Sequence, residues 1–343
     1  MNIVHIVWGL GIGGVESMLV DIANYQIESN AVSIIVINDN ISPMLQSKLD
    51  SRVKICPCHR KVGSKNPFPI IRLNLFLHKI KPDMIHVHME GIARLIRIKN
   101  GAPIIRTIHN ITSVSNEYPK FDKLFAISKA VQKRTLGQGF DSKVIYNGIH
   151  FDQVATSPHA MGQTCHIVNV GRLQNDKGQK VLVEAAKILK KQGDIHFTID
   201  FIGGGENETS LKELVNAYNL NDEIHFLGFK SREYVYENLC QYDLYVQPSI
   251  FEGFGLTLAE AIAAEVPVIT SDLEGPVEVI AGGKYGTSFK CGDANDLANK
   301  IIQFYRKEIT IDTEAARQFA FENFNIKATA QKYLDEYLSL LQR

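Results

Sequence analysis

Two glutamates, Glu252 and Glu260, flank a Gly-Phe-Gly turn in the stretch Pro-Ser-Ile-Phe-Glu-Gly-Phe-Gly-Leu-Thr-Leu-Ala-Glu of residues 248–260. The run before it, residues 243–247, reads as a strand that enters a loop, and residues 256–264 are strong helix formers. The first N–H groups of that helix would form an anion site between two carboxylates. Such a site suits a phosphate that carries hydroxyl-rich groups, although a capped surface helix with two solvated acids fits the spacing equally well.

Two cations lie in the segment Val-Gly-Arg-Leu-Gln-Asn-Asp-Lys-Gly of residues 170–178. Arg172 and Lys177 follow a predicted strand and stand beside the start of a predicted helix. An arginine fork and a mobile lysine charge at a helix N-terminus suit a diphosphate. Taken alone, a pair of solvated surface cations is the simpler interpretation.

A glycine-rich loop, Gly9-Leu-Gly-Ile-Gly-Gly14, follows the first predicted strand and opens a helix. It fits the Gly-x-Gly-x-x-Gly pattern of dinucleotide-binding folds, and Asp39 ends the second strand near where a ribose-binding acid would stand. An NAD(P)-dependent oxidoreductase that uses the Gly9–Gly14 loop therefore stays open as an alternative. Glu16 speaks against it, because an acid in the first helical turn would repel a pyrophosphate placed there.

Two histidines, His88 and His109, each end a predicted strand in the first half of the chain. Strand ends at that edge of a parallel sheet line the ligand site. A lone histidine is more often a structural residue. We expect His109 to be functional and regard His88 as the weaker candidate.

The fold class predicted by the whole pattern is α/β, because short β-branched runs alternate with helical stretches throughout. This alternation of strands and helices is interrupted over the polar residues 147–164, which predicts a linker there. We therefore expect two Rossmann-like, doubly wound parallel-sheet domains that face each other across a cleft, with ligands at the carboxyl ends of the strands. The predicted strands are 2–8, 32–38, 53–56, 83–88, 103–108, 123–127, 142–146, 165–170, 196–202, 223–227, 243–247, 267–270 and 286–289, and the predicted helices are 14–26, 67–80, 129–137, 178–191, 207–218, 231–240, 255–264 and 293–307.

Charge is unevenly distributed over the 343 residues, although the formal net charge is zero. Residues 1–155 hold 19 Lys or Arg against 11 Asp or Glu, and the remainder holds 18 against 26. Apolar residues such as Phe68 and Leu75 are interleaved with a basic group that includes Arg72, a combination that fits peripheral contact with anionic lipid headgroups, although a solvated helix face remains the alternative. Nucleic acid is not expected as a partner, because no recognition motif accompanies the charge.

Several motifs and segments that the sequence lacks restrict the types of reaction and the cellular location that we expect. The sequence contains no Asp-x-Asp, His-Glu-x-x-His or Gly-x-Ser-x-Gly motif, so neither a metal site nor a serine nucleophile is expected. The five cysteines form no paired framework, the N-terminus reads as a strand rather than a signal peptide, and no apolar run is long enough to span a membrane. The expectation is a cytoplasmic protein, peripheral at the inner face of the cell membrane.

Taken together, the motifs resemble those of the retaining GT-B glycosyltransferases of the family 4 type, over nearly the whole chain. The resemblance implies domains 1–155 on the acceptor side and 156–326 on the nucleotide-sugar side, with a helix over 327–343 that crosses back to the first domain. A sugar-nucleotide epimerase of the same fold is the remaining alternative. The motifs that carry the resemblance are Gly13-Gly-Val-Glu16, Ser128, Asn147-Gly-Ile-His150, Gly171-Arg172, Lys177-Gly178, Ile202-Gly-Gly-Gly205, Phe226-Leu-Gly-Phe229, the Glu252–Glu260 block, Pro267-Val-Ile269 and Gly275-Pro-Val-Glu278.

The resemblance also implies residue roles. Arg172 and Lys177 would neutralise the donor diphosphate, Glu252 would bind sugar hydroxyls, and His109 would touch the transferred sugar; these four form the implied catalytic set. The implied function is the transfer of a hexose from a UDP- or GDP-linked donor to a glycan or lipid-linked acceptor in bacterial surface polysaccharide assembly, without a metal or another cofactor. The implied donor-binding residues are Gly14, Gly171, Gly253, Phe254, Gly255, Leu256, Thr257, Glu260 at the ribose, and Phe229 and Lys230 at the base.

Overall fold

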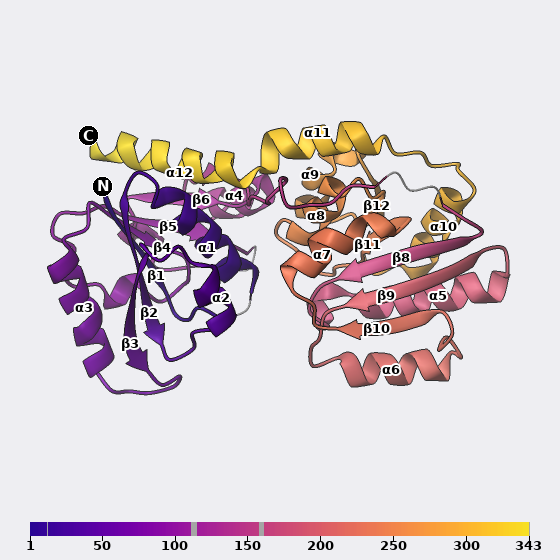
Figure 1. Ribbon diagram of the computed structural model, residues 1–343, viewed down its shortest axis with the longest axis horizontal. Helices are drawn as coiled ribbons and strands as arrows, with labels where there is room; N and C mark the ends of the chain where they lie inside the picture. The colour runs from indigo at the N-terminus through magenta and orange to yellow at the C-terminus, as the bar shows by residue number, and fades with distance from the viewer. Residues whose placement is uncertain (12, 111–114, 158–160, 343) are drawn as a thin grey trace. The chain divides into compact units, whose positions relative to one another are not determined.

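The computed structural model describes residues 1–11, 13–110, 115–157 and 161–342 and consists of two compact units (Figure 1). The first unit comprises Met1–Gly148 together with Ile326–Arg343, and the second comprises Ile149–Asn325. The first unit therefore ends inside the polar segment 147–164, at Gly148 rather than at residue 155. The C-terminal helix belongs to the first unit although the whole second unit precedes it in sequence.

The first unit is built on a seven-stranded sheet in the order β3-β2-β1-β4-β5-β6-β7, in which every strand pairing is parallel. The β-branched strand centres are buried, as expected for a sheet that is covered on both faces. Its strands are β1 (Asn2–Val7), β2 (Ala31–Asn38), β3 (Lys54–Arg60), β4 (Met84–Val87), β5 (Ile104–Ile108), β6 (Lys123–Ala126) and β7 (Lys143–Val144), and its helices are α1 (Gly14–Gln26), α2 (Pro43–Lys48), α3 (Phe68–Ile80), α4 (Lys129–Leu136) and α12 (Ile326–Leu341).

Alternation along β1 divides the core of the first unit into two layers. Val4 and Ile6 belong to a cluster with Leu73 and Leu77 of α3. The opposite face of the sheet carries Val7, which packs in a cluster with α1 and α2, and α12 lies against α1. Side chains at successive strand positions thus point to opposite faces, and α1 and α12 cover the same one.

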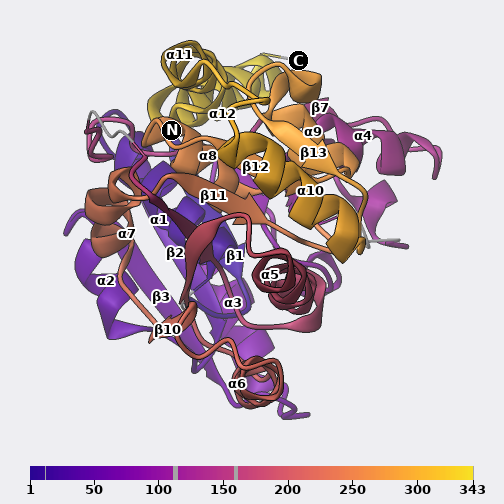
Figure 2. The ribbon, with the colours of Figure 1, turned by 90° about the vertical axis from the view of Figure 1, so that its right-hand side faces the viewer.

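The second unit is built on a six-stranded sheet in the order β10-β9-β8-β11-β12-β13, again with parallel pairing throughout. A single cluster of buried residues joins α5, α6 and α10 to one face of this sheet, and α11 packs on α8 (Figure 2). The strands are β8 (Thr164–Val170), β9 (His196–Ile202), β10 (Ile224–Gly228), β11 (Leu244–Gln247), β12 (Val268–Ser271) and β13 (Thr287–Phe289), and the helices are α5 (Gln179–Gln192), α6 (Glu208–Ala217), α7 (Arg232–Asn238), α8 (Leu256–Ala263), α9 (Glu274–Val279), α10 (Ala294–Tyr305) and α11 (Thr313–Phe324).

Two doubly wound parallel sheets confirm the predicted α/β fold class and its Rossmann-like units. In both sheets the strand order reverses beside the first strand, between β1 and β4 in one and between β8 and β11 in the other. Three helices were not predicted from the sequence: α2, α9 and α11. The short α2 and α9 contain too few turns for a helical period to show, and α11 follows the mixed segment Lys-Glu-Ile-Thr-Ile-Asp of residues 307–312.

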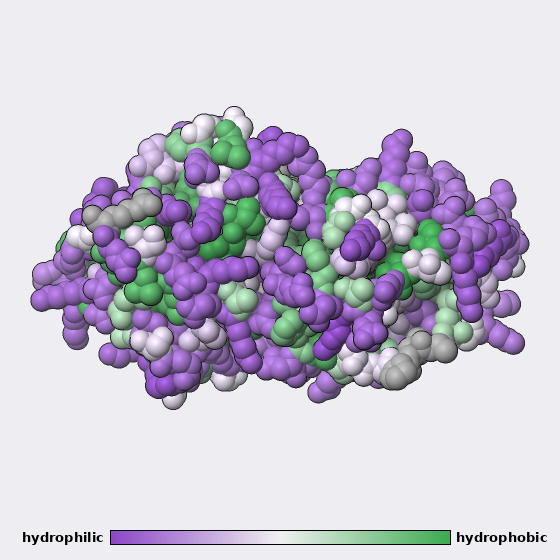
Figure 3. All heavy atoms as spheres, turned by 90° about the horizontal axis from the view of Figure 1, so that it is seen from above, coloured by the Kyte–Doolittle hydropathy of each residue, from purple (hydrophilic) through white to green (hydrophobic). Residues whose placement is uncertain are grey.

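The surface seen in Figure 3 carries hydrophobic residues in separate small groups among hydrophilic ones. Such scattered apolar residues are normal for a globular surface. None of the helices in the described ranges combines the length and apolarity needed to cross a bilayer.

Candidate functional site

The principal candidate site lies where the strand order of the second sheet reverses. We call the carboxyl ends of β8 and β11, with the loops 171–178 and 248–255 that follow them, the switch-point edge. Ligands of open α/β sheets bind at such positions, because the two loops diverge there and leave a crevice between them. The residues predicted at the start of the second domain and in the glutamate block both lie at this edge.

The two loops of the switch-point edge are joined by their backbones. The N–H groups of Ile250 and Phe251 both donate to the carbonyl oxygen of Asp176, over 2.9 and 3.1 Å. Gly178 has a φ of 66°, and a Cβ there would lie 1.9 Å from the carbonyl oxygen of Pro248. A side chain is therefore excluded at Gly178 both by its left-handed backbone and by the close approach of the second loop.

The structure brings Lys177 and Glu252 together. Lys177 ends the short 3-10 turn η3 (Asn175–Lys177), and its Nζ donates to Oε2 of Glu252 over 2.8 Å. The two side chains are 23% and 18% exposed. Both side chains are largely buried but can still be reached by a ligand. Lys177 and Glu252 can therefore give up their mutual contact for groups of an anionic, hydroxyl-rich ligand, and little further ordering of the two side chains is needed.

Arg172 is placed differently from Lys177. Its side chain is 65% exposed, and a guanidinium nitrogen lies 4.0 Å from a carboxylate oxygen of Asp176. An exposed pair at that distance holds the side chain only weakly, so Arg172 can turn toward a ligand. Beside it, a Cβ at Gly171 would meet nothing within 4 Å, which leaves this side of the loop open.

The start of α8 presents backbone groups rather than side chains. Gly255 caps the helix with a φ of 100°, and a Cβ there would lie 2.9 Å from Nε2 of Gln247. The Phe254 side chain is buried and packs edge-on against Phe324, so only the backbone of Phe254 is available to a ligand. The first N–H groups of α8, from Leu256 onward, have no acceptor within the helix.

Glu260 lies one turn inside α8 and is only 5% exposed. It is therefore much less accessible than Glu252, which lies in the loop before the helix. The two glutamates of the sequence pattern thus occupy different environments. Glu252 lies in the accessible loop of the switch-point edge, and Glu260 is buried beneath the start of α8. A matched acid–base pair would require two carboxylates with comparable access to the reacting atoms.

Sequence reasoning missed Tyr245, which supports the start of α8 from below. Its hydroxyl donates to Oγ1 of Thr257 over 2.7 Å, and burial raises the pKa of Tyr245. Gln247, two residues further along β11, has a buried Nε2 without a hydrogen-bond partner in the described residues. The signal was present in the alternation of polar side chains along 245–247, which places both residues on one face of the strand.

Phe229 and Lys230 follow β10, at the same end of the sheet as the switch-point edge but two strands away from it. Phe229 is 59% exposed. The Lys230 ammonium lies 5.0 Å from the centre of the Tyr234 ring, a distance at which a cation–π contact forms. The end of β10 is joined to the loop that follows β9, because Gly203 N donates to the carbonyl oxygen of Gly228.

The glycine-rich loop of the first unit, in which residue 12 lies outside the described residues, leads into a helix start that carries an acid. Gly14 is exposed and is the first residue of α1. A Cβ at Gly13 would lie 2.5 Å from a carboxylate oxygen of Glu16, so this acid folds back over the helix start. Asp39 is paired with His59, with 3.3 Å between its Oδ1 and the ring nitrogen Nδ1. Negative charge at the helix start opposes a pyrophosphate there.

His109 follows β5 and does not stand alone. Its Nε2 lies 3.4 Å from Nδ1 of the buried His88, whose Nε2 lies 3.0 Å from Nδ1 of His5. Burial, reinforced by the charge of Arg106, lowers the pKa of His109 to about 3. His109 is therefore neutral at physiological pH, and it can exchange hydrogen bonds with a ligand but carries no charge.

Three of the buried histidines, His5, His86 and His88, offer ring nitrogens within 4.8 Å of one another, a spacing that a metal ion can also use. All six of their nitrogens already have hydrogen-bond partners. A metal would have to replace these bonds inside a closed core, and no carboxylate belongs to the group. The residues fit a neutral hydrogen-bonded cluster better than a metal site.

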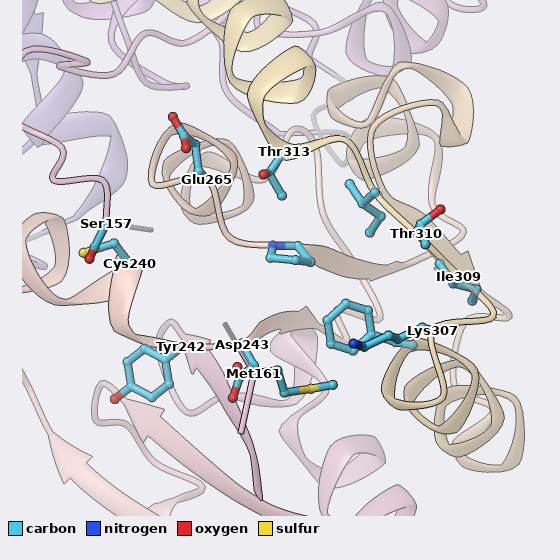
Figure 4. Close-up of a pocket in the computed structure, with 13 residues that line it drawn as sticks. Ser157, Met161, Cys240, Tyr242, Asp243, Glu265, Lys307, Ile309, Thr310 and Thr313 are labelled. Atoms are coloured by element: carbon cyan, nitrogen blue, oxygen red, sulfur yellow. The ribbon is translucent and has the colours of Figure 1, made fainter. Parts of the chain in front are cut away.

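A separate cavity of about 400 Å³ opens in the second unit, at the amino ends of β8, β11 and β12 (Figure 4). It lies at the end of the sheet opposite the switch-point edge and contains none of the predicted site residues. Its lining comprises Ser157, Met161, Cys240, Tyr242, Asp243, Glu265, Pro267, Phe304, Lys307, Ile309, Thr310, Ile311 and Thr313.

Two family models match the chain in succession. The model described as Glycosyltransferase Family 4 matches residues 12–153, and the model described as Glycosyl transferases group 1 matches residues 161–322. The second match contains the whole switch-point edge. Neither match favours the oxidoreductase or the epimerase alternative.

Curated relatives carry similar descriptions. The amylovoran biosynthesis glycosyltransferase AmsK of Erwinia amylovora is 29% identical over 230 residues, which cover 63% of this chain and 56% of the relative. The putative colanic acid biosynthesis glycosyltransferase WcaL of Salmonella typhimurium is 33% identical over 183 residues, which cover 50% of this chain and 44% of the relative. The chain thus spans about half the length of these relatives.

Solved structures share the fold over the full chain. A glycosyltransferase from Rickettsia africae is 23% identical, with a TM-score of 0.84 over 100% of this chain and 99% of the other. Anabaena Alr3699/HepE, solved in complex with UDP and glucose, is 21% identical, with a TM-score of 0.83 over 99% of both chains. These likenesses show the two-domain GT-B fold.

Proposed function

We propose that this chain, which belongs to the GT-B glycosyltransferases of the family 4 type, transfers a hexose from a nucleotide-sugar donor to a glycan or lipid-linked acceptor in polysaccharide assembly. The observation that carries the proposal is the Lys177–Glu252 pair at the switch-point edge. A cation for phosphate and a carboxylate for hydroxyls lie side by side there, as a sugar joined to a diphosphate requires.

The diphosphate is proposed to bind between Lys177, Arg172 and the first N–H groups of α8. When the donor binds, the Lys177 ammonium can turn from Glu252 to a phosphate oxygen, while the exposed Arg172 closes from the other side. Both cations stabilise the negative charge that develops on the leaving nucleoside diphosphate. They supply charge that a metal ion provides in other transferases, so the proposed reaction is metal-independent.

The two glutamates are proposed to bind different parts of the donor. Glu252, released from Lys177, accepts hydrogen bonds from hydroxyls of the transferred sugar. Glu260, buried beneath the helix start, accepts from the ribose hydroxyls once the nucleoside is in place. The exposed Phe229 with Lys230 borders the base, and His109 touches the transferred sugar.

The proposed chemistry retains the anomeric configuration. The bond from the anomeric carbon to the phosphate oxygen breaks, and the acceptor oxygen forms its bond on the same face of the sugar. The departing phosphate oxygen takes the acceptor proton. Glu252 is not proposed as a covalent nucleophile, because in the proposed complex its carboxylate oxygens accept hydrogen bonds from hydroxyls of the transferred sugar.

The names of similar proteins support the donor and pathway that we propose. Relatives named for amylovoran and colanic acid biosynthesis support polysaccharide assembly as the setting. Complexes of Anabaena Alr3699/HepE with UDP and with UDP-glucose support a nucleotide-linked hexose, for which we consider UDP and GDP.

A thermal-shift screen tests the proposed donor class directly. The full chain is heated with UDP- and GDP-linked hexoses, the free nucleotides, and NAD and NADP as controls. A ligand at one hundred times its Kd stabilises a protein by about 2.7 kcal/mol, which raises the melting temperature by several degrees. Stabilisation by one nucleotide sugar supports the proposal, whereas stabilisation by NAD or NADP alone contradicts it.

The exposed face of α3 is proposed to contact anionic membrane, where a lipid-linked acceptor would be found. Phe68, Ile71 and Leu75 are 71%, 51% and 59% exposed at helical spacing, and Val62 before the helix is 79% exposed. Lys61, Lys65, Arg72 and Lys79 surround them in sequence. Apolar side chains ringed by cations bind headgroups of anionic bilayers.

Vesicle sedimentation tests the membrane contact. The protein should pellet with vesicles of phosphatidylglycerol and phosphatidylcholine, and pelleting should fall in the double variant Phe68→Ser, Leu75→Ser. The matched control is Phe321→Ser, which removes a 47% exposed apolar side chain from α11. Equal pelleting of both variants, or pelleting with neutral vesicles alone, would count against an anionic contact through α3.

A further inference from the structure

Histidines from two neighbouring strands of the first sheet share one face. His5 of β1 and His86 of β4 are register partners, so their side chains project to the same side. Alternation adds His88 beyond the end of β4, Thr107 within β5, and His109 beyond the end of β5. The helices α1 and α12 cover this face.

A continuous hydrogen-bonded path joins these residues to the C-terminal helix. From His109 it passes to His88 (3.4 Å) and then to His5 (3.0 Å). It continues from His5 to Oε1 of Gln26 on α1 (2.8 Å). The remaining steps are Gln26 Nε2 to the Tyr337 hydroxyl (3.4 Å), Tyr337 to Nδ1 of His86 (2.6 Å), His86 Nε2 to Thr107 (2.8 Å) and Thr107 to the Tyr333 hydroxyl (3.0 Å).

The orientation of Gln26 sets the hydrogen-bond directions from His5 through His88 to His109. Its Oε1 faces His5, so Nε2 of His5 carries the proton and Nδ1 of His5 accepts. His88 must then donate from Nε2 and accept at Nδ1, because a neutral imidazole has one donor and one acceptor. His109 is left to donate from Nε2.

We propose that His88 is a positioning residue that holds His109 as the Nε2–H tautomer, with Nδ1 unprotonated and available to accept a hydrogen bond from a hydroxyl of the transferred sugar. This inference rests on the proposed function for its ligand, but the tautomer itself is a property of the free protein. Within the described residues, no group bonds to Nδ1 of His109. The neutral state of His109 agrees with its lowered pKa.

The C-terminal helix α12 joins the hydrogen-bonded path through Tyr337. Tyr337 accepts from Gln26 and donates to His86, so α12 holds the amide of Gln26 in the orientation that sets the tautomers. Tyr337 is fully buried, and burial raises its pKa, which keeps the hydroxyl protonated as a donor. A helix at the end of the chain thus determines which nitrogen of His109 carries a proton.

Nitrogen NMR of the histidine rings tests the proposal in the free protein. In ¹⁵N-histidine-labelled full-length protein at neutral pH, one-bond and long-range ¹H–¹⁵N correlations distinguish a protonated Nε2 from a protonated Nδ1. His109 is assigned by its loss in His109→Gln. We expect a single Nε2–H tautomer; a protonated Nδ1, or a mixture of the two tautomers, would overturn the proposal.

Two substitutions at His88 separate positioning from packing. In His88→Asn, the side-chain oxygen can occupy the place of Nδ1 and accept from His109, so the tautomer should survive. In His88→Phe no acceptor remains, and His109 should become a tautomer mixture. If the transferase proposal holds, kcat with the donor should fall about tenfold in His88→Phe and recover in His88→Asn.

The outcomes distinguish the two proposals. A fixed Nε2–H tautomer in a protein that binds no nucleotide sugar would reject the function and keep the hydrogen-bond assignment. Should His88→Phe not fold, His88→Asn and His88→Gln still decide, because Gln places its polar atoms near Nε2 and leaves His109 without its acceptor. Equal His109 spectra in the Asn and Gln variants would overturn the positioning role.

Discussion

Nζ of Lys177 lies 2.8 Å from Oε2 of Glu252, although the two residues come from loops after different strands. The contact forms because β8 and β11 are neighbours in the sheet, and because Asp176 and Gly178 join the two loops through backbone contacts. A cation and a carboxylate from separate sequence motifs are thereby held as one unit.

Removal of either charge of this pair should impair transfer more than folding. In Lys177→Met we expect transfer from the stabilising nucleotide sugar to fall about a hundredfold, the usual loss when one group that stabilises a developing charge is removed. In Glu252→Gln transfer should also fall, because the carboxylate that accepts hydrogen bonds from the sugar hydroxyls is lost. The measurement is initial velocity with labelled donor. The control is Lys180→Met, which removes a 71% exposed lysine that faces Glu184. Full activity in the two site variants, still folded, would refute the role of the pair.

Gly178 should tolerate no side chain. In Gly178→Ala the new methyl group would overlap the carbonyl of Pro248, so we expect a stability loss of about 3 kcal/mol or more and weaker nucleotide binding. Gly193→Ala is the matched control, since Gly193 also has a left-handed φ, 71°, but open space around its Cβ position. Urea denaturation compares the two, and equal losses would show that backbone strain alone matters at Gly178.

Tyr245 should strengthen donor binding, because its hydroxyl bonds to Thr257 at the start of α8. Loss of the hydroxyl in Tyr245→Phe should cost about 1 kcal/mol of stability and lower nucleotide affinity several-fold. Tyr242→Phe removes a hydroxyl bonded to Asp200 over the same 2.7 Å, away from the switch-point edge. Calorimetric titration should therefore find weaker binding in Tyr245→Phe only. Equal affinities in both variants would contradict a link between Tyr245 and the donor.

The histidine cluster should make stability fall in mild acid. Burial lowers the pKa of His5 from 6.5 to about 4, and burial also lowers the pKa values of His86, His88 and His109. The unfolded chain therefore binds more protons, so the stabilisation is complete above pH 6.5 and is lost as pH falls toward 4.

For His5 alone that loss is about 3.5 kcal/mol by the time the pH reaches about 4, at about 1.4 kcal/mol for each pKa unit. Urea denaturation at pH 7.5, 6.5, 5.5 and 5.0 measures the part that develops above pH 5.0, which is about 2 kcal/mol, in a range above the ordinary titration of carboxylates. His5→Gln should flatten the slope. A stability that stays constant from pH 7.5 to 5.0 would exclude a buried neutral cluster.

Much of the fold could be predicted from the sequence because parallel strands are continuous β-branched runs. The edges of β1 and β9 were predicted to within about one residue for this reason. The edges of α8 were predicted to a similar accuracy because residues 256–264 are strong helix formers. The helix α11 was not predicted, because its apolar positions, such as Phe324, pack against partners from distant parts of the chain. Local periodicity does not record such contacts.

The candidate site could also be predicted only in part, because local sequence patterns do not record contacts between distant residues. Motifs identified Lys177 and Glu252 separately, but only the strand order brings them into contact. Tyr245 was missed because a tyrosine in a strand usually indicates core packing. The histidine path was missed for a related reason: alternation predicts a shared face only after the pairing of β1 with β4 is known.

The binding position of the diphosphate decides whether the switch-point edge holds the donor. A crystal structure of the full chain with the nucleoside diphosphate of the stabilising donor would locate it. We predict phosphate oxygens within hydrogen-bond distance of Lys177 and of the first N–H groups of α8, at the switch-point edge of the second sheet. A diphosphate bound instead at the Gly9–Gly14 loop, with the Lys177–Glu252 pair undisturbed, would contradict this account.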